Sequence, residues 1–190
     1  MPLYLDPDSD QTCDGPLFEL PAHLRAHAQT MHAAAVVLGR FCVLLRGPTG
    51  SGKSFLQRQL RQQADWKGLY SALISDDYIQ LARAPLRFKQ TVASACPPLL
   101  AFAPVVTRRL EEVRGVGVIS ISRDDFVEQA VVSLLVDLVH PVQMERMPTR
   151  ENGVVDCLGH SIARMSVPQR SALAASELIF ARLSTWKDGC

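Results

Sequence analysis

The stretch GPTGSGKS at residues 47–54, called the glycine loop below, constrains the fold of this chain more than any other feature. It follows an apolar run, FCVLLR, and precedes FLQRQLRQQ, in which Leu56 and Leu60 lie on one side of a predicted helix. A strand, the pattern GxxxxGK[ST] and a helix in succession are typical of a P-loop, where backbone N–H groups and a helix N-terminus converge on phosphate oxygens. The sequence therefore predicts an α/β fold with a nucleotide-phosphate site, whereas a glycine turn without a ligand explains less of the pattern.

The glycine loop also assigns roles to particular side chains. Lys53 is expected to reach the β and γ phosphates of ATP, and the hydroxyl of Ser54 is expected to bind Mg²⁺. The residues predicted to contact the nucleotide are Gly47, Pro48, Thr49, Gly50, Ser51, Gly52, Lys53 and Ser54. A phosphate cradle of this kind serves hydrolysis, small-molecule phosphorylation and protein phosphorylation alike, so other residues must decide the reaction.

Two aspartates, Asp76 and Asp77, follow the segment LYSALIS, which is a predicted strand. Open α/β sheets place catalytic groups at such strand ends. Neighbouring side chains on a strand point to opposite sides, so one carboxylate could orient a metal while the other accepts a hydroxyl proton. On its own, a pair of aspartates is more often a solvated turn.

The rest of the chain is predicted to supply a sheet and a closing helix. A tight turn at Gly39 and Arg40 joins the first two strands. The remaining predicted elements are strands at residues 33–38, 41–46, 111–121 (entered from a loop), 130–139, around 142–147 and around 162–167, and a helix at 171–183. Residues 82–106 have no assignment, because Pro97 and Pro98 argue against one continuous helix.

Length and composition favour a single domain. A chain of 190 residues with 47% hydrophobic and 21% charged residues can bury one core. Residues 1–20 are rich in Asp, Pro, Ser and Gly and lack apolar periodicity. We therefore expect a flexible lead-in at residues 1–20 and one P-loop catalytic domain at residues 21–190.

Charge and hydropathy disfavour several classes of protein. The net charge is +1 and the basic residues are dispersed, so the sequence has no footprint for nucleic acid or anionic lipid. It has no secretory signal, and no segment approaches the roughly 18 uninterrupted apolar residues of a membrane span. The five cysteines lack CxxC spacing, which disfavours a disulfide framework or a zinc site and fits a reducing cytoplasm. We expect neither a nucleic-acid nor a membrane partner.

Five short motifs occur in a fixed order along the chain. They are HAAAV from His32, GPTGSGKS at 47–54, SDD at 75–77, EVRGVGV at 112–118 and ERMP at 145–148. Together they resemble the catalytic domain of the HPr kinase/phosphorylase family, bacterial enzymes that phosphorylate a serine of the phosphocarrier protein HPr. EVRGVGV is similar to that family's own signature, whereas the glycine loop is shared with many nucleotide-binding proteins. The resemblance extends from about His32 to Arg170.

The resemblance implies catalytic roles for four residues. His32 matches an active-site histidine of the family, although a lone histidine before a strand is more often structural. Lys53 would stabilise the transferring phosphoryl group, and Asp77 would take the proton from the substrate serine. Arg146 matches an arginine that would offset charge on the phosphoryl oxygens, although by itself it would be a surface arginine.

The resemblance also implies a metal site and secondary residues. Ser54 and Glu112 would hold Mg²⁺. Asp76, Arg114 and Arg170 are secondary candidates, since Arg114 lies in the signature and Arg170 ends a segment, MSVPQR, that the family associates with dephosphorylation.

The implied function is that of a Mg·ATP-dependent protein serine kinase acting on HPr or an HPr-like phosphocarrier, and so regulating the phosphotransferase system. The family also catalyses the reverse step, in which inorganic phosphate attacks the phosphoserine and pyrophosphate forms; Asp77 would then return the proton. The resemblance implies a central mixed β-sheet flanked by helices, a hexameric assembly and a bacterial cytoplasmic location. Two alternatives stay open: a non-catalytic ATP-binding sensor, and a P-loop kinase of a small metabolite.

The sequence departs from the family pattern in several places. Gln169 stands where a glycine usually precedes the arginine, which predicts an altered turn if φ must be positive there. Extra residues around ADWKG at 64–68, and a long segment between Asp77 and Glu112, predict surface insertions. Few residues precede His32, as in the short form of the family found in some proteobacteria, which lacks the N-terminal domain.

Overall fold

Strand β1 (Gln29–Leu38) is the centre of the sheet in the computed structural model, which describes residues 20, 24, 28–84, 98–147, 149, 151 and 153–186. Its antiparallel neighbours are β2 (Phe41–Arg46), β3 (Ser71–Ser75) and β4 (Tyr78–Arg83). The AAAV segment within β1 is fully buried, because its small side chains fit between layers packed on both faces. The β1–β2 turn places Gly39 at φ +59°, a conformation that glycine adopts without strain.

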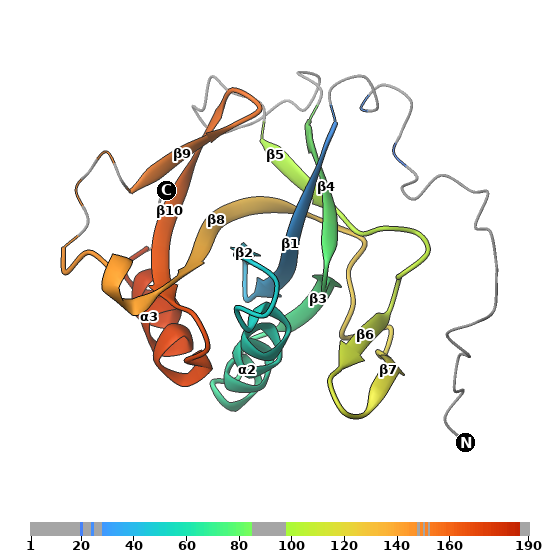
Figure 1. Cartoon of the computed structure of the whole chain (residues 1–190). Coiled ribbons are helices and arrows are strands. Elements are labelled where there is room, and N and C mark those ends of the chain that lie inside the picture. The colour runs from blue at the N-terminus through green and yellow to red at the C-terminus, as the bar shows by residue number, and fades with distance from the viewer. Residues whose placement is uncertain are drawn as a thin grey trace.

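Strand β8 (Gln129–Val139) is the second organising strand. It pairs in parallel with β2 and with β10 (His160–Pro168), and antiparallel with β5 (Leu99–Phe102). Because β5 also pairs with β4, the pairings run β2–β1–β4–β5–β8 and return to β2, a closed ring within an eight-stranded mixed sheet. Strand β9 (Val154–Cys157) extends the sheet beyond β10 (Figure 1).

Two helices, α2 (Lys53–Trp66) and α3 (Ala172–Ser184), lie side by side on one face of the sheet (Figure 1). Leu60 of α2 and Ile179 of α3 share one buried cluster with residues of β1, β2, β8 and β10. A second buried cluster fills the opposite face of the sheet, around Leu44 of β2 and Leu135 of β8. The chain therefore has the mixed α/β fold, with a central mixed sheet and helices, that the sequence predicts.

Most predicted elements are confirmed. The structure contains the strands expected at residues 33–38, 41–46, 69–75, 130–139 and 162–167, and the helices expected after Ser54 and at 171–183. Each of these has a clear period of apolar residues or an uninterrupted apolar run, because each contributes to one of the two buried clusters.

The strand predicted within residues 111–121 does not join the main sheet. Strands β6 (Leu110–Val113) and β7 (Gly117–Ser120) pair antiparallel and form a two-stranded sheet of their own. All four residues of β7 are exposed, so this strand lacks the buried face that would attach it to the core. The sequence therefore predicts a strand here correctly, but it does not predict that β7 pairs with β6 and stays outside the main sheet.

The short strand predicted around residues 142–147 is wrong. The 3₁₀ turn η1 (Pro141–Gln143) begins this segment, and His140 caps it. Nδ1 of His140 accepts from the N–H of Val142, while the N–H of His140 donates to the side-chain oxygen of Gln143. These local bonds satisfy backbone groups that a strand would need to pair with a neighbour.

The expected insertions are partly regular structure. ADWKG at residues 64–68 supplies the end of α2 and the turn after it, where Gly68 has φ +68°. The long segment after Asp77 contains β4 and β5, and residues 85–97 lie outside the described residues. The predicted lead-in at residues 1–20 also lies outside them, except for Leu20, which is buried in a cluster with Ala82 and Phe102.

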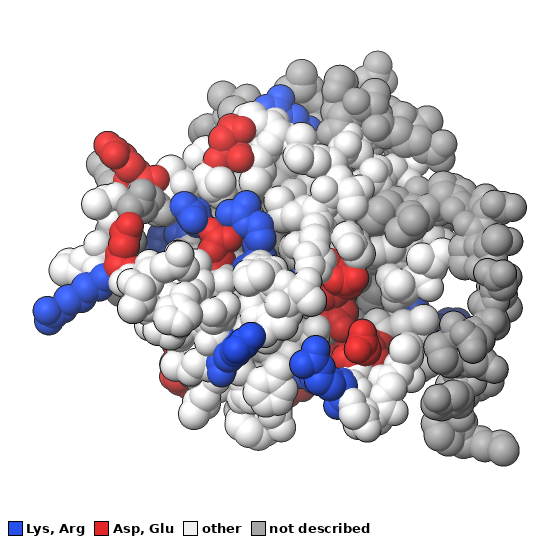
Figure 2. Space-filling model, viewed as in Figure 1, with Lys and Arg blue, Asp and Glu red and all other residues white. Residues whose placement is uncertain are grey.

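Acidic and basic side chains are interspersed on the face shown in Figure 2. Asp137 of β8 lies between Arg46 of β2 and Arg164 of β10, because these three strands are neighbours. The Nε atoms of Arg46 and Arg164 lie 2.7 Å from Oδ1 and Oδ2 of Asp137, respectively. Burial tends to raise the pKa of Asp137, but hydrogen bonds and charges from both arginines outweigh it and hold the pKa below its ordinary value.

None of the helices in the described part of the chain is long and apolar enough to cross a membrane.

Candidate active site

The glycine loop connects the end of β2 to the start of α2. Gly47 cannot carry a side chain here, because an added Cβ would lie 2.9 Å from Oγ of Ser51 and 3.0 Å from Cβ of Leu138. Gly52 has φ +97° and directly precedes the helix, whose first free N–H groups therefore face the loop. The loop and the helix N-terminus together form the arrangement of backbone donors that binds anions in proteins.

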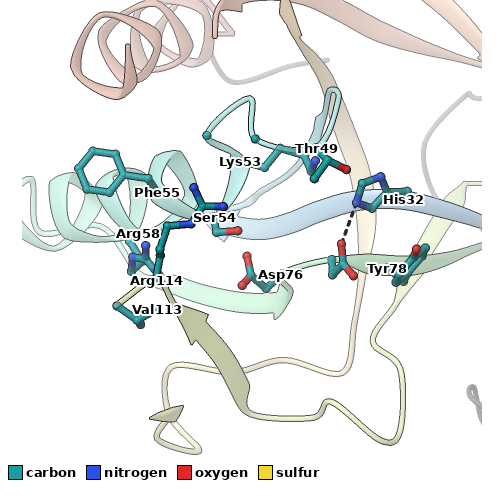
Figure 3. A pocket seen from close by; sticks show the side chains of 13 residues that line it. His32, Thr49, Lys53, Ser54, Phe55, Arg58, Asp76, Tyr78, Val113 and Arg114 are labelled. Carbon is teal, nitrogen blue, oxygen red and sulfur yellow. Dashed lines mark ion pairs between the residues drawn. The ribbon is translucent and has the colours of Figure 1, made fainter. Parts of the chain in front are cut away.

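A cavity of about 810 Å³ lies next to the glycine loop (Figure 3). Thr49, Gly50, Gly52, Lys53 and Ser54 of the loop line it. His32, Asp76, Asp77 and Arg114, which sequence reasoning also selected, line its other sides. The cavity therefore brings together residues from β1, the loop, the β3–β4 connection and the β6–β7 turn.

Lys53 lines this cavity and is itself buried. Its Nζ donates to the carbonyl of Gly47 at 2.9 Å and to that of Pro48 at 3.4 Å. An ammonium group has three donors, so these two bonds leave one for an anion in the cavity. Burial lowers the pKa of Lys53 below its ordinary value, while the charges of Asp77 and Asp76 partly offset this effect.

Asp76 is held on both carboxylate oxygens. Its Oδ1 accepts from Nε2 of Gln57 at 3.2 Å, and its Oδ2 accepts from the N–H of Glu112 at 3.3 Å. The side chain of Ser54 lies close enough to Asp76 to favour its charged form. Burial raises the pKa of Asp76 above its ordinary value, and the negative charge of nearby Glu111 raises it further. Ser54 and the N–H of Glu112 have the opposite effect, because they stabilise the charged carboxylate.

Asp77 points toward His32 on the neighbouring strand. Oδ1 of Asp77 lies 2.7 Å from Nε2 of His32, and the Asp77 side chain is 65% exposed (Figure 3). The ring of Tyr78 lies 5.2 Å from the ring of His32, so aromatic contact helps to orient the imidazole. Adjacent aspartates thus have different environments: Asp76 is enclosed, and Asp77 is open to a reactant.

Six predicted site residues do not line the cavity, namely Gly47, Pro48, Ser51, Glu112, Arg146 and Arg170. Glu112 is exposed, and its backbone makes the local bonds: its N–H donates to Asp76 and its carbonyl accepts from Nη1 of Arg58 at 2.9 Å. Arg146 is exposed in the segment after η1. The predicted roles of Glu112 and Arg146, as a magnesium ligand and as a phosphoryl-binding cation, stay predictions.

The turn after β10 closes on the glycine loop. The N–H of Arg170 donates to the carbonyl of Ser51 at 2.8 Å, and Nε of Arg170 lies 3.2 Å from the carbonyl oxygen of Gly50. Arg170 itself has φ +57°, whereas Gln169 is not among the described residues with positive φ. The residue with left-handed backbone is therefore Arg170, one position after Gln169, where the family resemblance predicts a glycine.

Sequence reasoning missed six residues that shape the site, among them Tyr78 and Val113, which line the cavity. Phe55 and Arg58 of α2 line the cavity beside Arg114 (Figure 3). Gln57 and Glu111 are buried behind it, where Nε2 of Gln57 donates to Oε1 of Glu111 at 2.8 Å. The sequence does contain a signal for Gln57, because this polar residue directly follows Leu56 on the apolar side of the predicted helix.

The donor chemistry of the cavity fits Mg²⁺. No three His, Cys, Asp or Glu side chains cluster as a metal cage within the described ranges. Magnesium usually needs no such cage, because one or two protein oxygens join substrate phosphates and water in its octahedron. The hydroxyl of Ser54 and the carboxylate of Asp76 are adjacent oxygens of the required kind.

No protein-family model matches the chain, and no curated protein does. Among solved structures, the HPr(Ser) kinase/phosphatase from Coxiella burnetii is similar, with a TM-score of 0.64 and 24% sequence identity over 83% of this chain and 89% of that chain. The resemblance drawn from the five sequence motifs is thereby confirmed at the level of the fold. The chain has the fold of an HPr(Ser) kinase/phosphatase.

Proposed function

We propose that this protein is a Mg·ATP-dependent kinase that transfers the γ-phosphoryl group to a serine of HPr or an HPr-like phosphocarrier. The observation that carries the proposal is the 2.7 Å contact between His32 and Asp77 in the cavity that Lys53 and the glycine loop also line. The similarity in fold to an HPr(Ser) kinase/phosphatase supports it.

The glycine loop is proposed to act as a P-loop and to bind the phosphates. Backbone N–H groups of the loop and of the first turn of α2 would bind the phosphate oxygens. The third donor of Lys53 would contact the β and γ phosphates, where negative charge changes during transfer. The bonds of Lys53 to the carbonyls of Gly47 and Pro48 support this proposal, because they hold its ammonium group beside the loop.

Ser54 and Asp76 are proposed to hold Mg²⁺. When bound, the ion neutralises charge on the phosphates during transfer. Asp76 is fixed by Gln57 and by the backbone of Glu112, so its carboxylate keeps one orientation toward Ser54. This assignment uses Asp76 in the role that the family resemblance gives to Glu112.

Asp77 is proposed to be the general base. His32 holds Oδ1 of Asp77, which leaves Oδ2 to accept the proton of an incoming serine hydroxyl. The exposed side of Asp77 suits a macromolecular substrate, because the serine must approach from outside the protein. In the reverse direction the protonated carboxyl would return the proton to the serine while inorganic phosphate attacks the phosphoserine and forms pyrophosphate.

Two arginines could offset charge on the phosphoryl oxygens. The family resemblance selects Arg146, which is exposed and outside the cavity lining. Arg114 lines the cavity, which supports it as a second candidate for this role. The wider biological setting that we propose is the bacterial phosphotransferase system in the cytoplasm, with the kinase assembled as a hexamer.

Transfer of labelled γ-phosphate to purified HPr-type protein tests the proposal. A kinase labels a serine of HPr, and with inorganic phosphate the labelled product yields pyrophosphate. A non-catalytic sensor labels nothing, and a kinase of a small metabolite labels only a small molecule. Absence of labelled HPr at saturating Mg·ATP would overturn the proposed function.

A further inference from the structure

Glu111 is an unusual residue in this fold, because it is a carboxylate with only 2% of its side chain exposed. Its Oε1 accepts from Nε2 of Gln57 at 2.8 Å and from Nη1 of Arg58 at 3.3 Å, and its Oε2 accepts from Nη2 of Arg61 at 2.5 Å. Gln57 and Arg58 are consecutive residues of α2 and Arg61 lies about one turn further along the helix, whereas Glu111 lies on β6. Glu111 therefore attaches the β6–β7 hairpin to the helix that follows the glycine loop.

The same network reaches both oxygens of Asp76 by separate routes. On the first route, the Gln57 amide donates one bond to Glu111 and another, at 3.2 Å, to Oδ1 of Asp76. On the second, Arg58 binds Glu111 and the carbonyl of Glu112, whose N–H donates to Oδ2 of Asp76 at 3.3 Å. Both routes start at Glu111 and end at Asp76.

Charge fixes the direction of the Gln57 amide. Two carboxylates face its nitrogen, and only the NH₂ end can donate to both of them. The opposite end, Oε1, is buried and has no hydrogen-bond partner among the described residues. An unpaired buried acceptor is unfavourable, so the bridge between Glu111 and Asp76 is what keeps the amide in this orientation.

We propose that Gln57 is a positioning residue for Asp76, with Glu111 as its buried anchor, and that this bridge sets the affinity of the site for the divalent cation. The inference rests on the proposed function, because it takes Ser54 and Asp76 as the metal-binding pair. Arg58 and Arg61 compensate the charge of Glu111, so the anchor orients Gln57 without leaving an unpaired anion behind the site. Residues behind a metal ligand commonly change metal affinity about 10- to 100-fold when they are replaced.

Gln57→Met tests the role of the Gln57 amide most directly. Methionine is unbranched, of similar length and a good helix former, but it donates no hydrogen bond, while Glu111 keeps both arginines. Gln63→Met is a matched control, because Gln63 lies on the same helix, is also buried and also has an unpartnered Oε1. Glu111→Gln tests the anchor, and its thermal unfolding shows whether the variant is folded.

The measurement is binding of Mn²⁺ to the protein in complex with a non-hydrolysable ATP analogue, by electron paramagnetic resonance. We expect Gln57→Met to weaken Mn²⁺ binding at least tenfold and to leave binding of the analogue in EDTA within twofold of the wild-type chain. Gln63→Met should change neither quantity, and folded Glu111→Gln should weaken Mn²⁺ in the same direction as Gln57→Met.

Three outcomes overturn the inference. They are Mn²⁺ affinity within twofold of wild type in Gln57→Met, an equal loss of metal-free analogue binding, or the same loss in Gln63→Met. A wild-type chain that binds no Mn²⁺–analogue complex overturns the proposed function as well, and this result is distinguishable because it appears before any substitution is made.

Discussion

Nε2 of His32 lies 2.7 Å from Oδ1 of Asp77, although 45 positions separate the two residues in the chain. Strand pairing brings them together, because His32 on β1 is the register partner of Tyr78 on β4, and Asp77 directly precedes that strand. The neighbouring carboxylate of Asp76 has other partners, because Gln57 and the N–H of Glu112 donate to it. Two adjacent aspartates are thereby separated into one open and one enclosed group.

Replacing Asp77 with Asn should abolish phosphoryl transfer to protein, with a loss of at least 100-fold in kcat, while ATP affinity changes less than about threefold. The base is removed but the glycine loop and Lys53 remain. Steady-state kinetics with HPr and calorimetric titration with an ATP analogue measure the two effects. Transfer at the wild-type rate in this variant would remove Asp77 from its proposed role.

Replacing Lys53 with Ala should impair both binding and transfer. The cavity loses its buried ammonium group, so we expect the affinity for ATP to fall at least tenfold and transfer to become undetectable. Lys53→Arg is an informative companion, because a guanidinium keeps the charge but does not fit the two carbonyl bonds of the ammonium. Unchanged ATP affinity in Lys53→Ala would contradict the assignment of the glycine loop.

Arg170 allows the backbone of its turn to be tested apart from its side chain. Arg170→Ala keeps a Cβ at φ +57° and loses the bond from Nε to Gly50, so it should lower the free energy of unfolding by about 1 kcal/mol. Arg170→Gly loses the same bond but relieves the left-handed strain, which recovers about 1 kcal/mol. Urea unfolding of both variants checks this, and equal stability of the two would argue against a strained turn.

Asp137→Asn should destabilise the fold by about 2 kcal/mol at pH 7, because Arg46 and Arg164 lose the anion between them. The pKa of Asp137 is lowered in the folded state, so its stabilisation is complete above the unfolded value of about 4 and disappears as the pH falls through the folded value. Urea unfolding of both proteins should therefore show a difference that is constant from pH 5 to 7 and shrinks below about pH 4.

The substitution Asp124→Asn is a control for the Asp137 measurement, since the Asp124 side chain lies at the surface and forms no ion pair with an arginine in the described part of the chain. It should leave stability within about 0.5 kcal/mol of wild type at every pH. A difference for Asp137→Asn that persists unchanged at pH 3 would contradict the proposed electrostatic origin.

Local patterns in the sequence were sufficient for the elements that pack into the core. The apolar runs of β2 and β8, and the spacing of Leu56 and Leu60 in α2, follow from burial of one or both faces. The glycine loop was also predictable, because its chemistry lies in consecutive residues. The hairpin of β6 and β7 was not, since nothing in residues 111–121 shows that they pair only with each other.

The sequence by itself determined which residues are candidates for chemistry here: a glycine loop with Lys53 and Ser54, two adjacent aspartates, and His32. Only the tertiary structure decided how they are arranged. It joins His32 to Asp77, encloses Asp76 with Gln57, and leaves the exposed Glu112 outside the cavity lining. The physical reason is that these contacts depend on strand register and on hydrogen bonds between distant segments, which no local period in a sequence encodes.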